Sequence, residues 1–261
     1  MSLHSFKVTL LGTGTSQGIP MIACECEVCS SLDKRDNRLR CSVLLELNEK
    51  NYVIDAGPDF RYQMLREKVK DLEGVIFTHE HKDHIAGLDD VRPFNYLNNK
   101  DIDIYCSSLV EIALRREYHY AFSGDDYPGI PKLNLIPIDK DHSFTLKEGV
   151  RILPVELMHY KLPVLGFRIE NFTYITDCKT ISETEFEKLK GTEVLIINAL
   201  REKEHISHLN LEEALKLIDK LRPKVAYLTH ISHLFGTHEE IEKKLPENVF
   251  VAYDGLKITL K

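Results

Sequence analysis

The sequence predicts a layered α/β protein, because short apolar runs rich in β-branched residues alternate along the chain with helical patterns. The predicted strands are Lys7–Gly12, Ser42–Leu47, Tyr52–Gly57, Gly74–Glu80, Asp101–Cys106, Val150–Leu157, Phe172–Asp177, Glu193–Ala199, Lys224–His230 and Val249–Asp254. The predicted helices are Phe60–Lys68, Leu109–Tyr118, Glu183–Leu189, Leu211–Leu221 and His238–Lys244. A length of 261 residues is within the range of one large α/β domain, so we expect a single domain over residues 1–261.

The sequence also predicts how several elements pair, begin or end. Short polar turns join the N-terminal strands, which favours mixed or antiparallel pairing there. Asn210 precedes an apolar-periodic run with acids in its first turn, so a helix is predicted to begin at Leu211 and to end at Arg222-Pro223. The glycines of LLGTGTSQG follow a strand, but their spacing is not G-x-G-x-x-G. They indicate a glycine turn rather than a dinucleotide loop.

Charge and composition narrow the function classes. The net charge is -7, and the basic residues are interspersed with acids, which is typical of a solvated surface rather than a nucleic-acid interface. No apolar run approaches the roughly 20 residues that span a bilayer. The N-terminus lacks a basic region and a cleavage site, so we expect a cytoplasmic protein without a membrane partner. In such a chain, clustered cysteines favour metal binding over disulfides.

The stretch THEHKDH follows a predicted strand and places His79, His81, Asp83 and His84 at its end. Alternate residues of an extended turn can point the same way, so His79 and His81 can share one metal ion. Asp83 and His84 lie past the bend and can face a neighbouring ion. Imidazole and carboxylate ligands suit Zn²⁺, Mn²⁺ or Fe²⁺.

This H-x-H-x-D-H pattern resembles the metallo-β-lactamase superfamily, whose fold is an αβ/βα sandwich of two mixed sheets flanked by helices. The resemblance implies further ligands near strand ends, and His159, Asp177 and His230 fit in order. A flavodiiron-type redox member would carry glutamate at the position of His81, so hydrolysis is implied. The implied ligand sets are His79, His81 and His159 for one ion and Asp83, His84 and His230 for the other, with Asp177 as the bridge.

The segment MIACECEVCSS contains the pattern C-x-C-x-x-C, formed by Cys24, Cys26 and Cys29. Three thiolates make an incomplete tetrahedral zinc site, since structural zinc prefers four nitrogen or sulfur ligands. Cys41 is a candidate for the fourth ligand, although it looks like the first residue of a strand. Three free cysteines are the alternative.

The LGTGTSQGIP turn, the cysteine cluster and the H-x-x-H of THISH together resemble one branch of the superfamily, the phosphoribosyl cyclic phosphate phosphodiesterases of phosphonate breakdown. This resemblance implies that His233 completes the cysteine site while His230 serves the dinuclear centre. It also implies that His208 assists catalysis, as a general acid or by contacting the phosphate, with Asp83 as the other catalytic side chain. His205 competes for the role of His208, and an ordinary surface histidine is the alternative.

We therefore expect a metal-dependent phosphodiesterase for a small phosphodiester, cyclic ones included. Its expected cofactors are two catalytic divalent ions, zinc or manganese, and one structural zinc. The rivals are a ribonuclease Z-like nuclease, a thioester or lactone hydrolase, and a binding protein like the pyrroloquinoline quinone biosynthesis protein B. The nuclease is disfavoured because no basic arm is visible and the irregular loop Ala121–Lys132 carries Asp125 and Asp126. The segment Pro93–Lys132 could line the substrate site or pack as a helix and loop, and a homodimer stays open.

Overall fold

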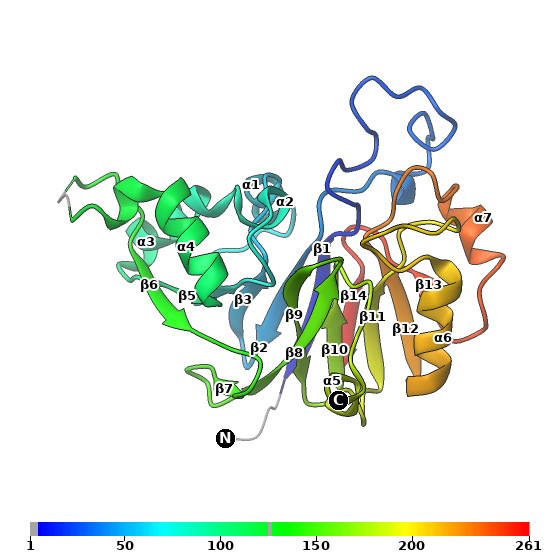
Figure 1. Ribbon diagram of the computed structural model, residues 1–261. Helices are drawn as coiled ribbons and strands as arrows, with labels where there is room; N and C mark the ends of the chain where they lie inside the picture. The colour runs from blue at the N-terminus through cyan, green and yellow to red at the C-terminus, as the bar shows by residue number, and fades with distance from the viewer. Residues whose placement is uncertain (1–4, 125–126, 261) are drawn as a thin grey trace.

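In the computed structural model, which describes residues 5–124 and 127–260, two mixed β-sheets face each other and helices cover their outer sides (Figure 1). Asp125 and Asp126 of the expected loop lie outside the described residues. The first sheet runs in the order β14 (Lys257–Leu260), β1 (Phe6–Gly12), β2 (Ser42–Leu47), β3 (Lys50–Ile54), β4 (Gly74–Ile76), β5 (Ile102–Cys106), β6 (Leu133–Pro137). The second runs in the order β13 (Val249–Val251), β12 (Val225–Thr229), β11 (Val194–Asn198), β10 (Phe172–Ile175), β9 (Leu162–Ile169), β8 (Arg151–His159), β7 (Phe144–Thr145).

Each sheet is antiparallel in one half and parallel in the other. Strands β14, β1, β2 and β3 pair antiparallel, and β3 to β6 pair parallel. The second sheet repeats this plan, with antiparallel β7 to β10 and parallel β10 to β13. The expected αβ/βα sandwich and the antiparallel pairing of the N-terminal strands are both confirmed.

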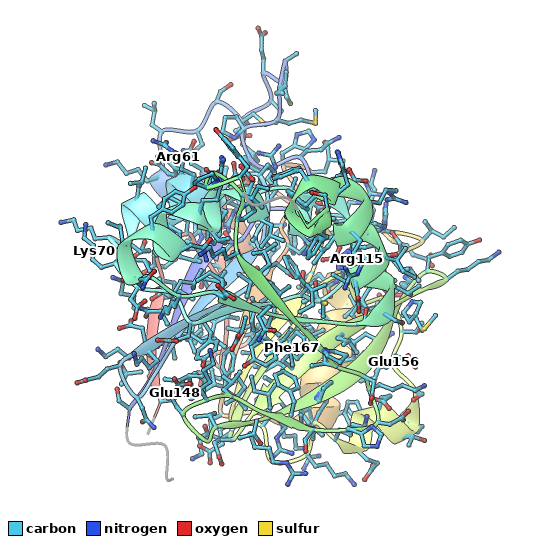
Figure 2. The ribbon with its side chains drawn as sticks, turned by 90° about the vertical axis from the view of Figure 1, so that its left-hand side faces the viewer. Arg61, Lys70, Arg115, Glu148, Glu156 and Phe167 are labelled. Atoms are coloured by element: carbon cyan, nitrogen blue, oxygen red, sulfur yellow. The ribbon has the colours of Figure 1, made fainter. Side chains whose placement is uncertain are left out.

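Three apolar clusters hold the layers together. The first fills the space between the sheets and includes Phe167 and Tyr174, both fully buried. Figure 2 shows Phe167 in the interior of the molecule. The second cluster packs β10 to β13 against α5 (Glu183–Glu187), α6 (Leu211–Leu221) and α7 (His238–Glu242). The third packs the first sheet against α1 (Phe60–Arg66), α3 (Arg92–Asn98) and α4 (Ser108–Glu117).

Helix α6 illustrates how the local sequence sets an element's limits. The Asn210 side chain accepts a hydrogen bond from the Glu213 backbone, and the Glu213 side chain accepts one from the Asn210 backbone, which forms a capping box. Arg222 adopts a left-handed conformation at the C-terminus, directly before Pro223. The helix predicted over Leu211–Leu221 is therefore confirmed at both ends.

The segment Pro93–Lys132 packs on the first sheet. Its helices α3 and α4 and the 3₁₀ turn His119–Phe122 belong to the third apolar cluster or pack against it. Arg115, labelled in Figure 2, pairs with Glu111 at 2.8 Å, and its guanidinium lies over the Phe122 ring. The described part of this segment thus has a packing role. In the part of the chain that the structure describes, no helix has the length and apolar character to cross a membrane.

Candidate metal centres

The predicted ligands lie where strands of both sheets end. His79 follows β4, Asp177 follows β10, His230 follows β12, and His159 is the last residue of β8. Asp83 and His84 lie on the short helix α2 (Lys82–Ile85). Asp177 and His230 have positive φ angles of 54° and 59°, a left-handed conformation that costs of order 1–3 kcal/mol. Such strained positions cluster at functional sites because the surrounding structure fixes them.

His79, His81 and His159 come together on the more open side of this centre. The Nε2 atom of His79 lies 3.0 Å from the Nδ1 atom of His81. The His159 ring is 5.2 Å from the His81 ring, and its Nδ1 is 2.8 Å from the carbonyl oxygen of Ser207, which leaves Nε2 free to bind an ion. His79 is buried whereas His81 is exposed, so this side faces solvent.

The second group is deeper and surrounds Asp177. The Asp177 Oδ2 atom lies 3.3 Å from Nε2 of His84 and 3.4 Å from Nδ1 of His230. Asp83 Oδ2 approaches the same Nε2 of His84 at 3.2 Å. His84, Asp177 and His230 are each at most 2% exposed. The structure therefore brings all seven predicted side chains to one place, from both sheets.

Asp55 is a candidate functional residue that the sequence analysis missed. It follows β3, has a φ of 64°, and is fully buried. Its carboxylate accepts hydrogen bonds from the Thr78 backbone and hydroxyl, and Oδ2 lies 2.7 Å from Nδ1 of His84. A carboxylate behind a metal-binding histidine fixes its tautomer and orientation. The available signal was an acid directly after the strand that precedes THEHKDH.

The charges around His84 favour a cation at this position. Burial opposes charge on His84, but Asp55, Asp177 and Asp83 outweigh it and hold the pKa of that imidazole well above its usual value. For Asp177 burial favours the neutral acid, yet His230 and His84 outweigh it and hold the pKa well below its usual range. Three carboxylates in a buried site thus create a strong demand for positive charge.

The donor set fits divalent ions. The Nε2 atom of His84 is buried without a hydrogen-bond partner in the described structure, although two carboxylates lie near it. One ligand atom each of His79, His84 and Asp177 lies within 4.8 Å of the others. Buried, unshared imidazole nitrogens that converge on carboxylate oxygens are the arrangement that zinc and manganese sites use.

His208 borders the same centre. Its ring stacks at 4.7 Å on His230 and lies 4.5 Å from the His159 ring, and its Nδ1 is 3.8 Å from Asp177. That nitrogen is buried without a hydrogen-bond partner among the described residues. Burial, followed by the charge of His230, lowers the pKa of His208 to about 2, so the ring is neutral. His205 lies farther out, 5.1 Å from the His208 ring.

The three clustered cysteines and His233 form a separate group. The sulfurs of Cys24 and Cys26 both lie 3.4 Å from Nδ1 of His233. Zn–S bonds of about 2.3 Å and Zn–N bonds of about 2.0 Å at tetrahedral angles place sulfur and nitrogen about 3.5 Å apart, so this spacing fits zinc. His233 lowers the pKa of the Cys26 thiol to about 6, which favours the thiolate that zinc requires.

Cys41 is not part of this group. It is buried, and its thiol donates to the carbonyl oxygen of Gly14 at 3.2 Å. Burial raises the pKa of the Cys41 thiol to about 12, which disfavours the thiolate. His238, at the start of α7, is also apart from both groups and is buried, with Nδ1 3.3 Å from Nη2 of Arg38.

A sequence model of the family described as "Beta-lactamase superfamily domain" matches residues 50–231, a range that includes all seven predicted ligands. The chain belongs to the metallo-β-lactamase superfamily. The crystal structure of a diphosphatase from the PhnP family is 36% identical, covers 99% of this chain and 98% of its own, and has a TM-score of 0.92. At that identity and coverage, the chain belongs to the PhnP family as well.

Two other proteins are also similar to this chain, each in a more limited way. Zn²⁺-bound PqqB from Methylobacterium extorquens matches with a TM-score of 0.78 over 97% of this chain and all of its own, but at 17% identity it shows only a common fold. A curated octanoyltransferase from Porphyromonas gingivalis is 38% identical over 96% of this chain. The chain spans about half (51%) of that relative's length, so a second half of the relative has no counterpart in the match.

Proposed function

We propose that this hydrolase cleaves a small phosphodiester, cyclic ones included, or a diphosphate at a dinuclear metal centre, with a separate structural zinc at the cysteine site. The observation that carries the proposal is the convergence of six nitrogen and oxygen ligands around the buried carboxylate of Asp177. The 36% identical relative is a diphosphatase, which supports phosphorus rather than carbon as the centre attacked. Zinc and manganese both suit the ligands.

The proposed ligand sets are those implied by the sequence, with His79, His81 and His159 for one ion and Asp83, His84 and His230 for the other. The two ions, when bound, would lower the pKa of a water molecule and offset charge on the phosphoryl oxygens. Asp177 lies between the two groups and is proposed to bridge them. Asp55 holds His84 in place, and the Ser207 carbonyl does the same for His159.

His208 is proposed to contact the phosphoryl group. Its ring borders both ligand groups, and its neutral state before substrate binds argues against a proton stored there in advance. A bound anion would raise the pKa of His208, so a role as acid during the reaction remains compatible with this position. His208, His159 and Asp177 also lie within metal-binding distance of one another, so His208 as a ligand is the competing role.

The test compares substrates and metal content together. Protein loaded with zinc or manganese is assayed on bis(4-nitrophenyl) phosphate, a five-membered cyclic ribose phosphate and an octanoyl thioester. We expect turnover of the phosphorus substrates to exceed that of the thioester by at least tenfold. The opposite ranking would overturn the proposal. Thioester hydrolysis is the second candidate because the half-length match is to an octanoyltransferase.

His208→Ala separates the roles of that residue. An acid role predicts a large loss of turnover with an alkyl leaving group and a small loss with 4-nitrophenolate, which leaves without a proton. A phosphate contact predicts equal losses with both leaving groups and unchanged metal content. Loss of a metal ion from the variant would identify His208 as a ligand and remove both other roles.

A further inference from the structure

Arg40 lies beside the centre in a conformation that is held but incompletely paired. Its Nε donates to the carbonyl oxygen of Ser16 at 3.1 Å, and its Nη1 lies 3.3 Å from both carboxylate oxygens of Asp59. The side chain is 29% exposed. No hydrogen bond of the described residues engages its Nη2. Two neighbours thus fix the plane of the guanidinium and leave one edge for a ligand.

Two structural links connect Arg40 to the proposed ligands. Thr15, the residue before Ser16, has its hydroxyl 3.2 Å from Nε2 of His230. On the other side, Gly57 separates Arg40 from Asp83. A Cβ at Gly57 would lie 2.0 Å from the Asp83 carbonyl oxygen and 3.8 Å from the Arg40 Cβ, so only glycine permits this close approach. The Arg40 Cβ therefore lies near the Asp83 backbone, and the Arg40 guanidinium contacts the loop after β1, whose Thr15 reaches His230.

Two of the other cations on the loops that carry the proposed ligands are already paired with acids. Lys82 pairs with Glu117, and both carboxylate oxygens of Glu213 accept hydrogen bonds from Lys179, at 2.7 and 2.9 Å. Arg40 makes only long contacts with its acid, and its planar fork matches the spacing of phosphate oxygens. A guanidinium with a free edge, fixed beside a phosphate-cleaving centre, is suited to a second anionic group of the same substrate.

We infer that Arg40 anchors a second phosphoryl group, so that the preferred substrate is a diphosphate diester rather than a lone phosphodiester. This inference rests on the proposed function. In the reaction, the oxygen of water bonds to one phosphorus, and the bond from that phosphorus to the bridging oxygen breaks. The bridging oxygen leaves with the second phosphoryl group, which Arg40 holds, and the two protons of water are shared between the two phosphate monoester products.

The experiment uses two substrates that differ by one phosphoryl group, bis(4-nitrophenyl) phosphate and P1,P2-bis(4-nitrophenyl) diphosphate. Arg40→Ala should lower kcat/KM for the diphosphate about 10- to 100-fold, the range expected for a charged hydrogen bond, and for the monophosphate less than about threefold. Arg40→Lys should fall between, since it keeps the charge and loses the fork. Equal losses on both substrates would overturn the inference.

Arg151→Ala is the matched control. Arg151 is exposed at the start of β8, and His159 ends that strand, so the same charge is removed roughly 26 Å from the centre. It should leave the ratio of the two kcat/KM values unchanged. If Arg151→Ala shifts the ratio as Arg40→Ala does, long-range charge is responsible and the anchoring contact is excluded.

Asp59→Asn separates anchoring from a structural role. It weakens the pairing of Arg40 and frees the guanidinium, so binding of the non-hydrolysable methylene analogue of the diphosphate, measured by calorimetry, should be retained or tightened. Arg40→Ala should weaken that binding at least tenfold. Matching losses in both variants would show that the Arg40–Asp59 pair only supports the fold. Failure of the wild type to cleave either phosphorus substrate would overturn the proposed function, while calorimetry would still report on Arg40.

Discussion

Asp55→Asn should weaken metal retention although Asp55 touches no ion in the proposed centre. The carboxylate accepts hydrogen bonds from the backbone and hydroxyl of Thr78 at 2.9 and 2.8 Å and contacts Nδ1 of His84 at 2.7 Å. This partner keeps the proton on Nδ1 and the lone pair on Nε2. An asparagine whose oxygen stays on the Thr78 N–H turns its NH₂ group toward His84. The proton must then move to Nε2, the atom proposed to bind the ion.

The expected magnitude follows from this contact. Removal of such a partner typically costs 10- to 100-fold in metal affinity, or about 1.4–2.8 kcal/mol. The fold itself should lose less. One buried hydrogen bond contributes about 1 kcal/mol, and the variant also removes a buried carboxylate whose pKa burial raises. Metal affinity should therefore fall more than the stability of the metal-free protein.

The assay is metal content by mass spectrometry after dialysis against a graded series of chelator concentrations, with thermal unfolding of the metal-free protein alongside. Asp103→Asn is the control. Asp103 is 2% exposed on β5 of the same sheet and pairs with Lys147 and Asn134, away from the proposed ligands. Equal metal retention by wild type, Asp55→Asn and Asp103→Asn would refute the tautomer argument.

Three further predictions test other parts of the structure. His230→Ala should abolish activity and keep the zinc at the cysteine site, whereas His233→Ala should release that zinc at a lower chelator concentration. The reverse pattern in metal analysis would assign His233 to the dinuclear centre and His230 to the cysteine site. Burial raises the pKa of Asp254 to about 6, so the folded state binds an extra proton between about pH 4 and 6. The protonated Asp254 therefore contributes its full stabilisation below about pH 4, and this stabilisation is lost as the pH rises through 6. In denaturant unfolding, the wild type should lose about 3 kcal/mol of unfolding free energy relative to Asp254→Asn between pH 4 and 7. Parallel plots of unfolding free energy against pH for the two proteins would contradict this. Asn210→Ala should lower the free energy of unfolding by about 1 kcal/mol through loss of the capping box, while no change would show that Glu213 alone suffices.

Local signals were sufficient for much of the fold. The ten predicted strands and five predicted helices all occur, because their apolar periodicity and caps are encoded within each segment. Strand β9 was missed because Pro163 and Gly166 interrupt its pattern, and β14 because it is a short edge strand with an exposed face. Helix α2 has only four residues, too few to show a helical period.

The candidate site, too, could be predicted from the sequence only in part. Four of the seven predicted ligands stand out in THEHKDH after a strand, and the family resemblance implied the other three, His159, Asp177 and His230. The role of Asp55 depends on β3 and β4 being parallel neighbours, so that Asp55 and Thr78 meet beyond the strand ends. The free edge of Arg40 depends on Ser16 and Asp59, which are 24 and 19 residues away in the chain. Contacts between distant segments leave no periodic trace in a single sequence.

The segment His230–His233 links the two proposed metal sites mechanically. His230 faces Asp177, and His233 faces the cysteines. Between them, the Ile231 backbone donates to Thr13 and accepts from Thr15, which fixes the loop after β1. That loop carries the Ser16 carbonyl that orients Arg40. Loss of the ion at the cysteine site would therefore loosen the guanidinium as well as the tip of the loop. The proposed structural zinc would in this way affect how a substrate is held without touching the reacting atoms.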